Sequence, residues 1–325
     1  MTSLATLAPV SKAKARVSID GILNIDKPPG RTSFSVVAQV RRWSGERRVG
    51  HAGTLDPAAT GVLLVCLSQA TRVISILAEA RKTYRAQVEL GAATDTYDGE
   101  GMVTQRGDHS LITREQVEAA LGPFRGLIRQ IPPMYSAVKY QGRPLYRLAR
   151  AGIEVPRKER RAEVYRLELI EWQPPLLTLE VECGKGTYIR TLAHDLGQVL
   201  GCGAYLKGLA RLRVGTFSLE DAVALPQLER AFTMGYWREL LHPIDSVLTH
   251  LPAAVVAESV EQAIRHGQGI ILGAAPQGET CRAYSMTGQL IALLRFCPES
   301  GMWQPSKVFL PLDSPNSPKL PPINP

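Results

Sequence analysis

The chain carries one carboxylate, Asp56, inside a segment rich in glycine and proline, residues 50–61 (GHAGTLDPAATG). Pro57 fixes its own φ angle and favours extended backbone at Asp56, while the glycines allow tight turns and close approach to a ligand. An apolar run at residues 62–67 follows and predicts a buried strand. Asp56 is therefore expected in a stiff loop anchored to the core, which is how a site holds a nucleophile. Taken alone, an Asp-Pro pair more often only starts a turn.

Sequence periodicity predicts the elements that surround this loop. Residues 82–90 alternate between apolar and polar side chains, which indicates a strand with Tyr84 at its start, on the apolar face. Residues 177–183 alternate in the same way and predict a second half-buried strand. Residues 32–43 begin with a hydroxyl cap and carry valines at helical spacing, so they predict a helix.

A further helix is expected from about Thr187 to the glycine-containing break at residues 201–203. Tyr188 and Arg190 fall in its first turn. A cation at a helix amino terminus opposes the helix dipole, so Arg190 requires an anion, and Asp56 is the candidate. The alternative is a surface arginine that faces a phosphate or nothing.

Adjacent prolines at residues 130–135 begin a long loop, and we expect residues 130–166 to form a basic, nucleic-acid-binding lobe outside the main sheet. Between Lys139 and Arg166 nine residues are basic and three are acidic. A solvated helix face is the alternative, but such faces more often alternate in sign. Phosphate contacts are therefore predicted for four of these residues, Arg157, Lys158, Arg160 and Arg161.

Composition agrees with a nucleic-acid partner. The 325 residues suffice for one large domain and a small one, and the formal net charge is +8. Five scattered cysteines form no Cys-x-x-Cys pair and six histidines show no metal-ligand spacing, so we expect reduced thiols, a cytoplasmic protein and no metal. No apolar run approaches the roughly 18 residues of a membrane span. Residues 1–19 lack a signal-peptide core and are expected to form a flexible basic arm.

Three motifs in order, residues 24–33 (NIDKPPGRTS), 50–61 and 184–191 (GKGTYIRT), resemble those of the TruB family of bacterial tRNA pseudouridine synthases. The resemblance runs from about Gly21 to about Ala224. It implies an α+β fold in which a mixed, largely antiparallel sheet is flanked by helices.

The resemblance also suggests where the domains lie. Residues 20–248 would form the catalytic domain. Residues 249–312 contain short apolar segments, expected as strands, and a capping box at Ser259 that would open one helix. This part resembles the PUA-like RNA-binding module that often follows TruB catalytic domains. The proline-rich residues 313–325 are expected to be disordered.

By the resemblance, Asp56 is the nucleophile of a reaction that needs no metal or cofactor. The carboxylate would attack either the anomeric carbon of the ribose or C6 of the uracil ring, and the sequence leaves both routes open. Arg190 would keep Asp56 ionised and aligned, because a nearby guanidinium lowers a carboxyl pKa and can bind it through two nitrogens. Tyr84 would stack on the target base and could assist in removing the proton from C5.

A uridine inside a folded loop must be flipped out before it can react. The resemblance implies that Tyr188 and the backbone near Leu209 contact the flipped nucleotide. It also implies that His51 fills or supports the vacated space, whereas an isolated histidine there would more simply tie a loop.

The sequence therefore predicts an enzyme that isomerises uridine 55 in the T stem-loop of tRNA, acting as a monomer. One alternative is an RNA-binding or RNA-folding factor whose catalytic step is dispensable. Another is an enzyme with the same chemistry that acts on ribosomal RNA.

Overall fold

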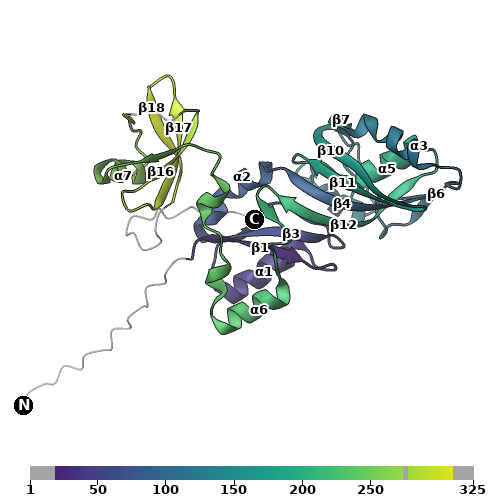
Figure 1. Ribbon diagram of the computed structural model, residues 1–325, viewed down its shortest axis with the longest axis horizontal. Coiled ribbons are helices and arrows are strands. Elements are labelled where there is room, and N and C mark those ends of the chain that lie inside the picture. Colours follow the sequence, from purple (N-terminus) through teal and green to yellow (C-terminus); the bar gives the residue numbers. More distant parts are fainter. Residues whose placement is uncertain (1–18, 274–276, 310–325) are drawn as a thin grey trace, which may run out of the picture. The chain divides into compact units, whose positions relative to one another are not determined.

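The computed structural model describes residues 19–273 and 277–309, which form two compact units (Figure 1). The larger unit comprises Gly21–Val247, and the smaller one begins at Leu248. The predicted arm, except for its last residue, and the predicted tail lie outside the described residues. All five cysteines lie within them and are free thiols.

The larger unit is built on a sheet of ten strands. Its main path runs β14-β1-β3-β12-β4-β11-β10-β7, with β2 paired to β3 and β13 paired to β12. Only the pairs β1–β14 and β3–β12 within this sheet are parallel, so the sheet is mixed and largely antiparallel, as predicted. The strands are β1 (Gly21–Lys27), β2 (Val49–His51), β3 (Thr60–Leu67), β4 (Lys82–Leu90), β7 (Gly126–Gln130), β10 (Arg160–Gln173), β11 (Leu176–Cys183), β12 (Ala204–Val214), β13 (Phe217–Ser218) and β14 (Val223–Ala224).

Helices and two small hairpins complete this unit. The α-helices are α1 (Ser33–Ser44), α2 (Ile74–Glu79), α3 (Arg114–Ala120), α4 (Leu145–Arg150), α5 (Ile189–Val199) and α6 (Leu225–Met234). The hairpins pair β5 (Ala92–Thr94) with β6 (Val103–Arg106) and β8 (Lys139–Tyr140) with β9 (Arg143–Pro144). Short 3-10 helices are η1 (Ser68–Val73), η2 (Gly122–Phe124), η3 (Trp237–Leu240) and η4 (Ile244–Val247). None of the helices in the described ranges is long and apolar enough to cross a membrane.

The strand and helices predicted around Asp56 are confirmed. β4 has the predicted bounds, and its buried side chains alternate along the strand from Lys82 onward. α1 begins after Thr32, whose hydroxyl accepts a hydrogen bond from the Ser35 amide at 3.0 Å. α5 follows Tyr188 and buries Ile189, Leu192 and Leu196 against the sheet.

The expectation of one long basic loop at residues 130–166 is wrong at its end. β10 begins at Arg160, and Arg160 and Arg161 pair with Gln130 and Arg129 of β7 inside the main sheet. Ala162 and Val164 are buried between exposed charged residues, which is a strand pattern that the run of charges concealed. Only the part with β8, β9 and α4 lies outside this sheet.

The smaller unit is mainly β, as predicted. Its sheet has the order β15-β16-β17-β18, formed by β15 (Ala253–Val255), β16 (Thr280–Tyr284), β17 (Leu290–Cys297) and β18 (Met302–Val308). Helix α7 (Glu258–Arg265) covers a core that includes Ile264 and Trp303. The predicted cap at Ser259 is wrong: Ala257 is the N-cap, no side chain caps the helix, and Ser259 lies inside it.

Candidate active site

The loop that carries Asp56 joins β2 to β3 and is held to the start of α1. The Ser33 hydroxyl accepts a hydrogen bond from the Leu55 amide at 2.9 Å and donates one to the Leu55 carbonyl at 3.1 Å. The Gly30 amide donates to the Pro57 carbonyl at 2.9 Å. The residues on both sides of Asp56 are therefore fixed by backbone contacts.

A buried lysine, Lys27, also holds this loop in place. Lys27, at the end of β1, is fully buried and its ammonium donates to the carbonyls of Pro28, Arg31 and Pro57 at 2.9, 2.7 and 3.1 Å. Burial lowers the pKa of Lys27 to about 8, and the negative charge of Asp56 opposes that shift. Lys27 thus stabilises both the loop and the ionised form of Asp56.

The structure brings Arg190 and Asp56 together. Arg190 Nε lies 3.0 Å from Asp56 Oδ2, and its Nη2 lies 3.4 Å from Oδ1, so the guanidinium binds the carboxylate through two nitrogens. The Arg190 side chain is 8% exposed and that of Asp56 is 42% exposed. Arg190 Nη2 also donates to the Tyr135 carbonyl at 2.8 Å. The carboxylate that points toward solvent is therefore aligned by a buried, fixed cation.

A second carboxylate, Asp98, shares this arginine, and sequence reasoning missed it. Arg190 Nη1 lies 3.3 Å from Asp98 Oδ2. The other oxygen of Asp98 accepts hydrogen bonds from the Thr96 hydroxyl at 2.6 Å and the Glu100 amide at 3.2 Å. Tyr97, just before it, has a φ of +65°, a left-handed conformation uncommon for residues other than glycine. This turn follows no periodic pattern, so nothing in the sequence marks Asp98 as part of the site.

The charges around Asp56 act on its pKa in opposite directions. Burial raises the pKa of the Asp56 carboxyl above its ordinary value, and the Arg190 cation opposes that rise. The negative charge of Asp98 raises the pKa further, and Lys27 lowers it. Arg190 and Lys27 are therefore the groups that favour the ionised form of Asp56.

The start of α5 is anchored by Gln130, another residue that sequence reasoning missed. The Gln130 side chain, 3% exposed, accepts from the Tyr188 amide at 3.0 Å and donates to the Tyr188 carbonyl at 3.2 Å. Gln130 is the last residue of β7, so this pair ties the sheet to the helix turn that carries Arg190. The prolines that follow Gln130 predict a loop, so sequence reasoning assigned Gln130 no role at the site.

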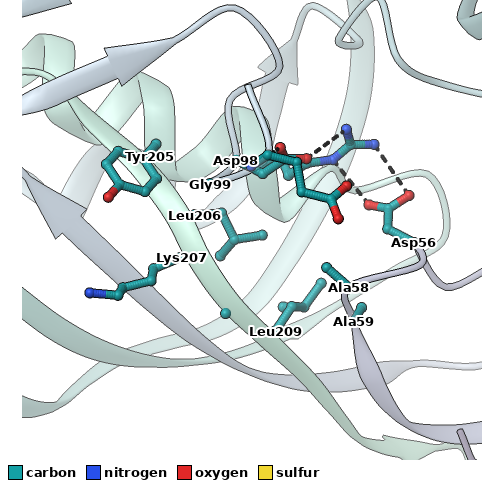
Figure 2. A pocket seen from close by; sticks show the side chains of 12 residues that line it. Asp56, Ala58, Ala59, Asp98, Gly99, Tyr205, Leu206, Lys207 and Leu209 are labelled. Atoms are coloured by element: carbon teal, nitrogen blue, oxygen red, sulfur yellow. Dashed lines mark hydrogen bonds and ion pairs between the residues drawn. The ribbon is translucent and has the colours of Figure 1, made fainter. Parts of the chain in front are cut away.

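A cavity of about 310 Å³ opens beside Asp56 (Figure 2). It extends along β12, with Asp56 and Asp98 at one side and Tyr205 and Lys207 at the other. The small side chains of Ala58 and Ala59 leave room next to Asp56. The lining consists of Asp56, Ala58, Ala59, Asp98, Gly99, Glu100, Arg190, Tyr205, Leu206, Lys207, Gly208 and Leu209. The predicted residues Asp56, Arg190 and Leu209 are thus all at this cavity.

Tyr84, His51 and Tyr188 are not part of this lining. Tyr84 is 8% exposed on the covered face of β4, and burial raises the pKa of its phenol. His51 ends β2, and burial, followed by the charge of Arg211, lowers the pKa of its imidazole, which is therefore neutral at pH 7. Tyr188 is the N-cap residue of α5.

The four basic residues predicted to contact phosphates differ in their surroundings. Lys158, Arg160 and Arg161 are exposed. The Arg157 side chain is only 18% exposed, donates to the Pro132 carbonyl at 3.2 Å and lies 3.5 Å from Glu154. On the outer side of β10, Arg166 forms ion pairs with Glu168 and Glu180, so its charge is largely compensated.

Comparison with known proteins gives consistent matches. The model of the TruB family pseudouridylate synthase N-terminal domain matches residues 41–189, and that of the tRNA pseudouridylate synthase B C-terminal domain matches residues 190–249. A "tRNA pseudouridine synthase B" of Dehalococcoides mccartyi is 47% identical over 293 residues, covering 90% of this chain and 97% of that protein. A Pseudomonas aeruginosa protein of the same name is 43% identical over 283 residues, covering 86% and 93%.

Solved structures agree with these matches. A structure described as a Cbf5-Nop10-Gar1 complex has a TM-score of 0.68 and 29% identity, covering 90% of this chain and 85% of that one. An H/ACA RNP structure, described as bound to a substrate RNA containing 2'-deoxyuridine, has a TM-score of 0.67 and 26% identity, covering 90% and 86%. The fold and the matches define a pseudouridine synthase, an enzyme of the isomerase class. The chain belongs to the TruB family of pseudouridylate synthases.

Proposed function

We propose that this protein converts uridine 55 in the T stem-loop of tRNA into pseudouridine, with Asp56 as the nucleophile and without a metal or cofactor. The observation that carries the proposal is the ion pair between Asp56 and Arg190, 3.0 Å long, at a cavity that the nucleophile faces. The name of a relative that is 47% identical over 293 residues supports tRNA as the substrate. The family resemblance of the motifs supports position 55.

In this mechanism the bond between the ribose and uracil N1 breaks, the base rotates, and a bond forms between the ribose and uracil C5. Asp56 attacks either the anomeric carbon, which releases a uracil anion and leaves the ribose bonded to the carboxylate, or C6 of the ring. In the first route C5 of the rotated base attacks the anomeric carbon and displaces the Asp56 carboxylate. In the second route the bond between Asp56 and C6 breaks once the new bond to C5 has formed, which regenerates the carboxylate. The proton on C5 leaves after the new bond has formed, and its electron pair restores the ring double bond. Because Arg190 is buried and held by three partners, its charge is already oriented when the substrate arrives.

The remaining predicted residues have roles in base recognition. Leu209 lies in the cavity lining, which supports a backbone contact with the flipped nucleotide. We propose that Tyr84 stacks on the target base and assists in removing the C5 proton, that Tyr188 contacts the nucleotide, and that His51 supports the space it vacates. A neutral His51 suits this role, because it places no charge in the space that the flipped nucleotide vacates.

We propose two additional RNA contacts. Lys158, Arg160 and Arg161 are exposed and basic, which suits contact with phosphates. The small unit after Leu248 would add affinity as a PUA-like module. The active form is a monomer in this proposal, and a tRNA substrate supports action in the cytoplasm.

The experiment is conversion of a synthetic T stem-loop RNA by the purified protein, with pseudouridine detected by mass spectrometry. We expect conversion at position 55 and none in a matched RNA with cytidine there. Ribosomal RNA fragments form a second arm. Conversion of these fragments alone would contradict the tRNA assignment. Binding of the stem-loop without conversion in either arm would favour the RNA-folding factor.

A further inference from the structure

Arg211, on β12, is a buried cation that the proposed reaction does not yet use. It is 1% exposed and is one of the two largest side chains of the core, together with Lys27. Within the described ranges no aspartate or glutamate forms an ion pair with it. Burial of a charge is costly unless its hydrogen bonds are satisfied, so the partners that Arg211 does have must compensate it.

Those partners come from the loop of the nucleophile and from the strand of Tyr84. Arg211 Nε donates to the Val62 carbonyl at 2.7 Å, and Nη2 donates to the Gly53 carbonyl at 3.1 Å. In the sheet register Arg211 lies opposite Tyr84, and the charge and hydrogen bonding of its guanidinium oppose the rise that burial causes in the pKa of the phenol. One rigid planar group therefore connects the residues before Asp56, the strand after it and the Tyr84 side chain.

The backbone around Arg211 is equally constrained. In the sheet register Arg211 lies opposite both Gly61 of β3 and Tyr84 of β4. Gly61 has a φ of +97°, and a Cβ atom there would lie 2.2 Å from the Arg211 carbonyl oxygen. The close approach of β3 and β12 at this point brings the guanidinium against the loop that carries Asp56, where it binds the Gly53 carbonyl.

We propose that Arg211 is a positioning residue for catalysis. It fixes the Tyr84 hydroxyl relative to the Gly53 carbonyl, and so holds the target base in the correct position relative to Asp56. The inference rests on the proposed function of Asp56 and Tyr84. It is consistent with the direction in which Arg211 acts on Tyr84: burial raises the pKa of the phenol, and the hydrogen bond and charge of Arg211 oppose that rise.

The test uses the full-length protein with Arg211→Lys, which keeps the charge but replaces the planar guanidinium by a single ammonium nitrogen on a flexible stem, and Arg211→Met, which removes the charge. Arg213→Met is the matched control, because Arg213 is exposed on the same strand. We expect Arg211→Lys to lower the single-turnover rate roughly a hundredfold, as for a misplaced reacting group. Affinity for tRNA should stay within about twofold of the unmodified protein, and Arg213→Met should change neither.

A double-mutant cycle with Tyr84→Phe separates positioning from a general structural role. If Arg211 acts through the Tyr84 hydroxyl, Arg211→Lys should slow the Tyr84→Phe enzyme much less than it slows the unmodified enzyme. Additive losses, or an Arg211→Lys rate equal to that of the unmodified protein, would overturn the proposal. The lysine variant decides the question even where Arg211→Met fails to fold.

A readout without catalysis distinguishes this inference from the proposed function. Tyrosine labelled with ¹³C at the ζ carbon reports the phenol hydrogen bond by NMR, and Tyr84→Phe assigns the Tyr84 signal. We expect this signal to move in both Arg211 variants and to stay in place in Arg213→Met. An unmoved signal refutes the Arg211 contact whatever the activity, whereas inactivity of the unmodified protein on uridine RNA would refute only the proposed function.

Discussion

Asp98 Oδ2 lies 3.3 Å from Arg190 Nη1, on the guanidinium whose Nε binds the nucleophile. Two carboxylates thus hold one buried arginine, and the Asp56 side chain, 42% exposed, is the more accessible of the two. Asp98 is 20% exposed and is fixed by its own turn. It therefore orients Arg190 from a fixed position in the cavity lining.

Removal of the Asp98 charge should slow the chemical step. Asp98→Asn weakens a charge-assisted hydrogen bond to Arg190, worth roughly 1.5 to 3 kcal/mol, or about tenfold to a hundredfold in rate. We expect a lower kcat on tRNA, with KM nearly unchanged. Asp95→Asn, an exposed aspartate in the same turn, is the control. Equal rates for Asp98→Asn and this control would show that Asp98 does not support Arg190.

The pH dependence of the rate gives a second prediction for the same residue. The nucleophile must be ionised, so the rate falls as the pH drops through the pKa of Asp56. The negative charge of Asp98 raises that pKa, so its removal should lower it. The acid limb of the rate profile should lie at lower pH in Asp98→Asn than in Asp95→Asn. A limb displaced to higher pH would contradict this assignment of charges.

Gly197→Ala should destabilise the protein although it lies in helix α5. Helix propensity alone favours alanine by about 1 kcal/mol. However, a Cβ atom at Gly197 would lie 2.0 Å from the Ala204 backbone nitrogen, so helix and sheet would have to separate. We expect a lower midpoint in urea denaturation and a slower enzyme, because α5 carries Arg190. Val199→Ala, exposed on the same helix, should stay within about 0.5 kcal/mol.

The exposed basic residues should set the salt dependence of RNA binding. Replacing Lys158, Arg160 and Arg161 by glutamine should weaken tRNA binding. The slope of log affinity against log salt should flatten by roughly 0.7 to 0.9 for each phosphate that is no longer neutralised. Arg166→Gln is the control, because its charge is already paired with Glu168 and Glu180. An unchanged slope in the triple variant would show that these side chains do not bind phosphates.

The sequence predicted the parts of the site that lie in regular elements or in the family motifs. Asp56 is marked by glycines and proline, and Arg190 is marked by its unfavourable place in the first turn of α5. The distance between them along the chain is 134 residues, yet the helix-dipole argument pairs them correctly. The dipole argument required an anion near Arg190, and the family motifs singled out Asp56 as that anion.

The remaining contacts depend on tertiary placement that no periodicity shows. Asp98 lies in an irregular turn, and its meeting with Arg190 is set by how that turn folds onto β12. Gln130 lies beside prolines that suggested a loop, and β10 was concealed by its charged residues. Nothing in the sequence distinguishes Arg211, because a buried arginine that binds carbonyls and an exposed arginine look alike in a sequence.

The central claim is that Asp56 is the nucleophile, and Asp56→Asn tests it most directly. The amide keeps the size of the side chain but cannot attack, so binding should survive while chemistry cannot begin. We expect tRNA affinity within about tenfold of the unmodified protein, or about 1.4 kcal/mol, and no pseudouridine in a single-turnover assay with enzyme in excess. Substantial isomerisation by Asp56→Asn, with deamidation to aspartate excluded by mass spectrometry, would contradict the account.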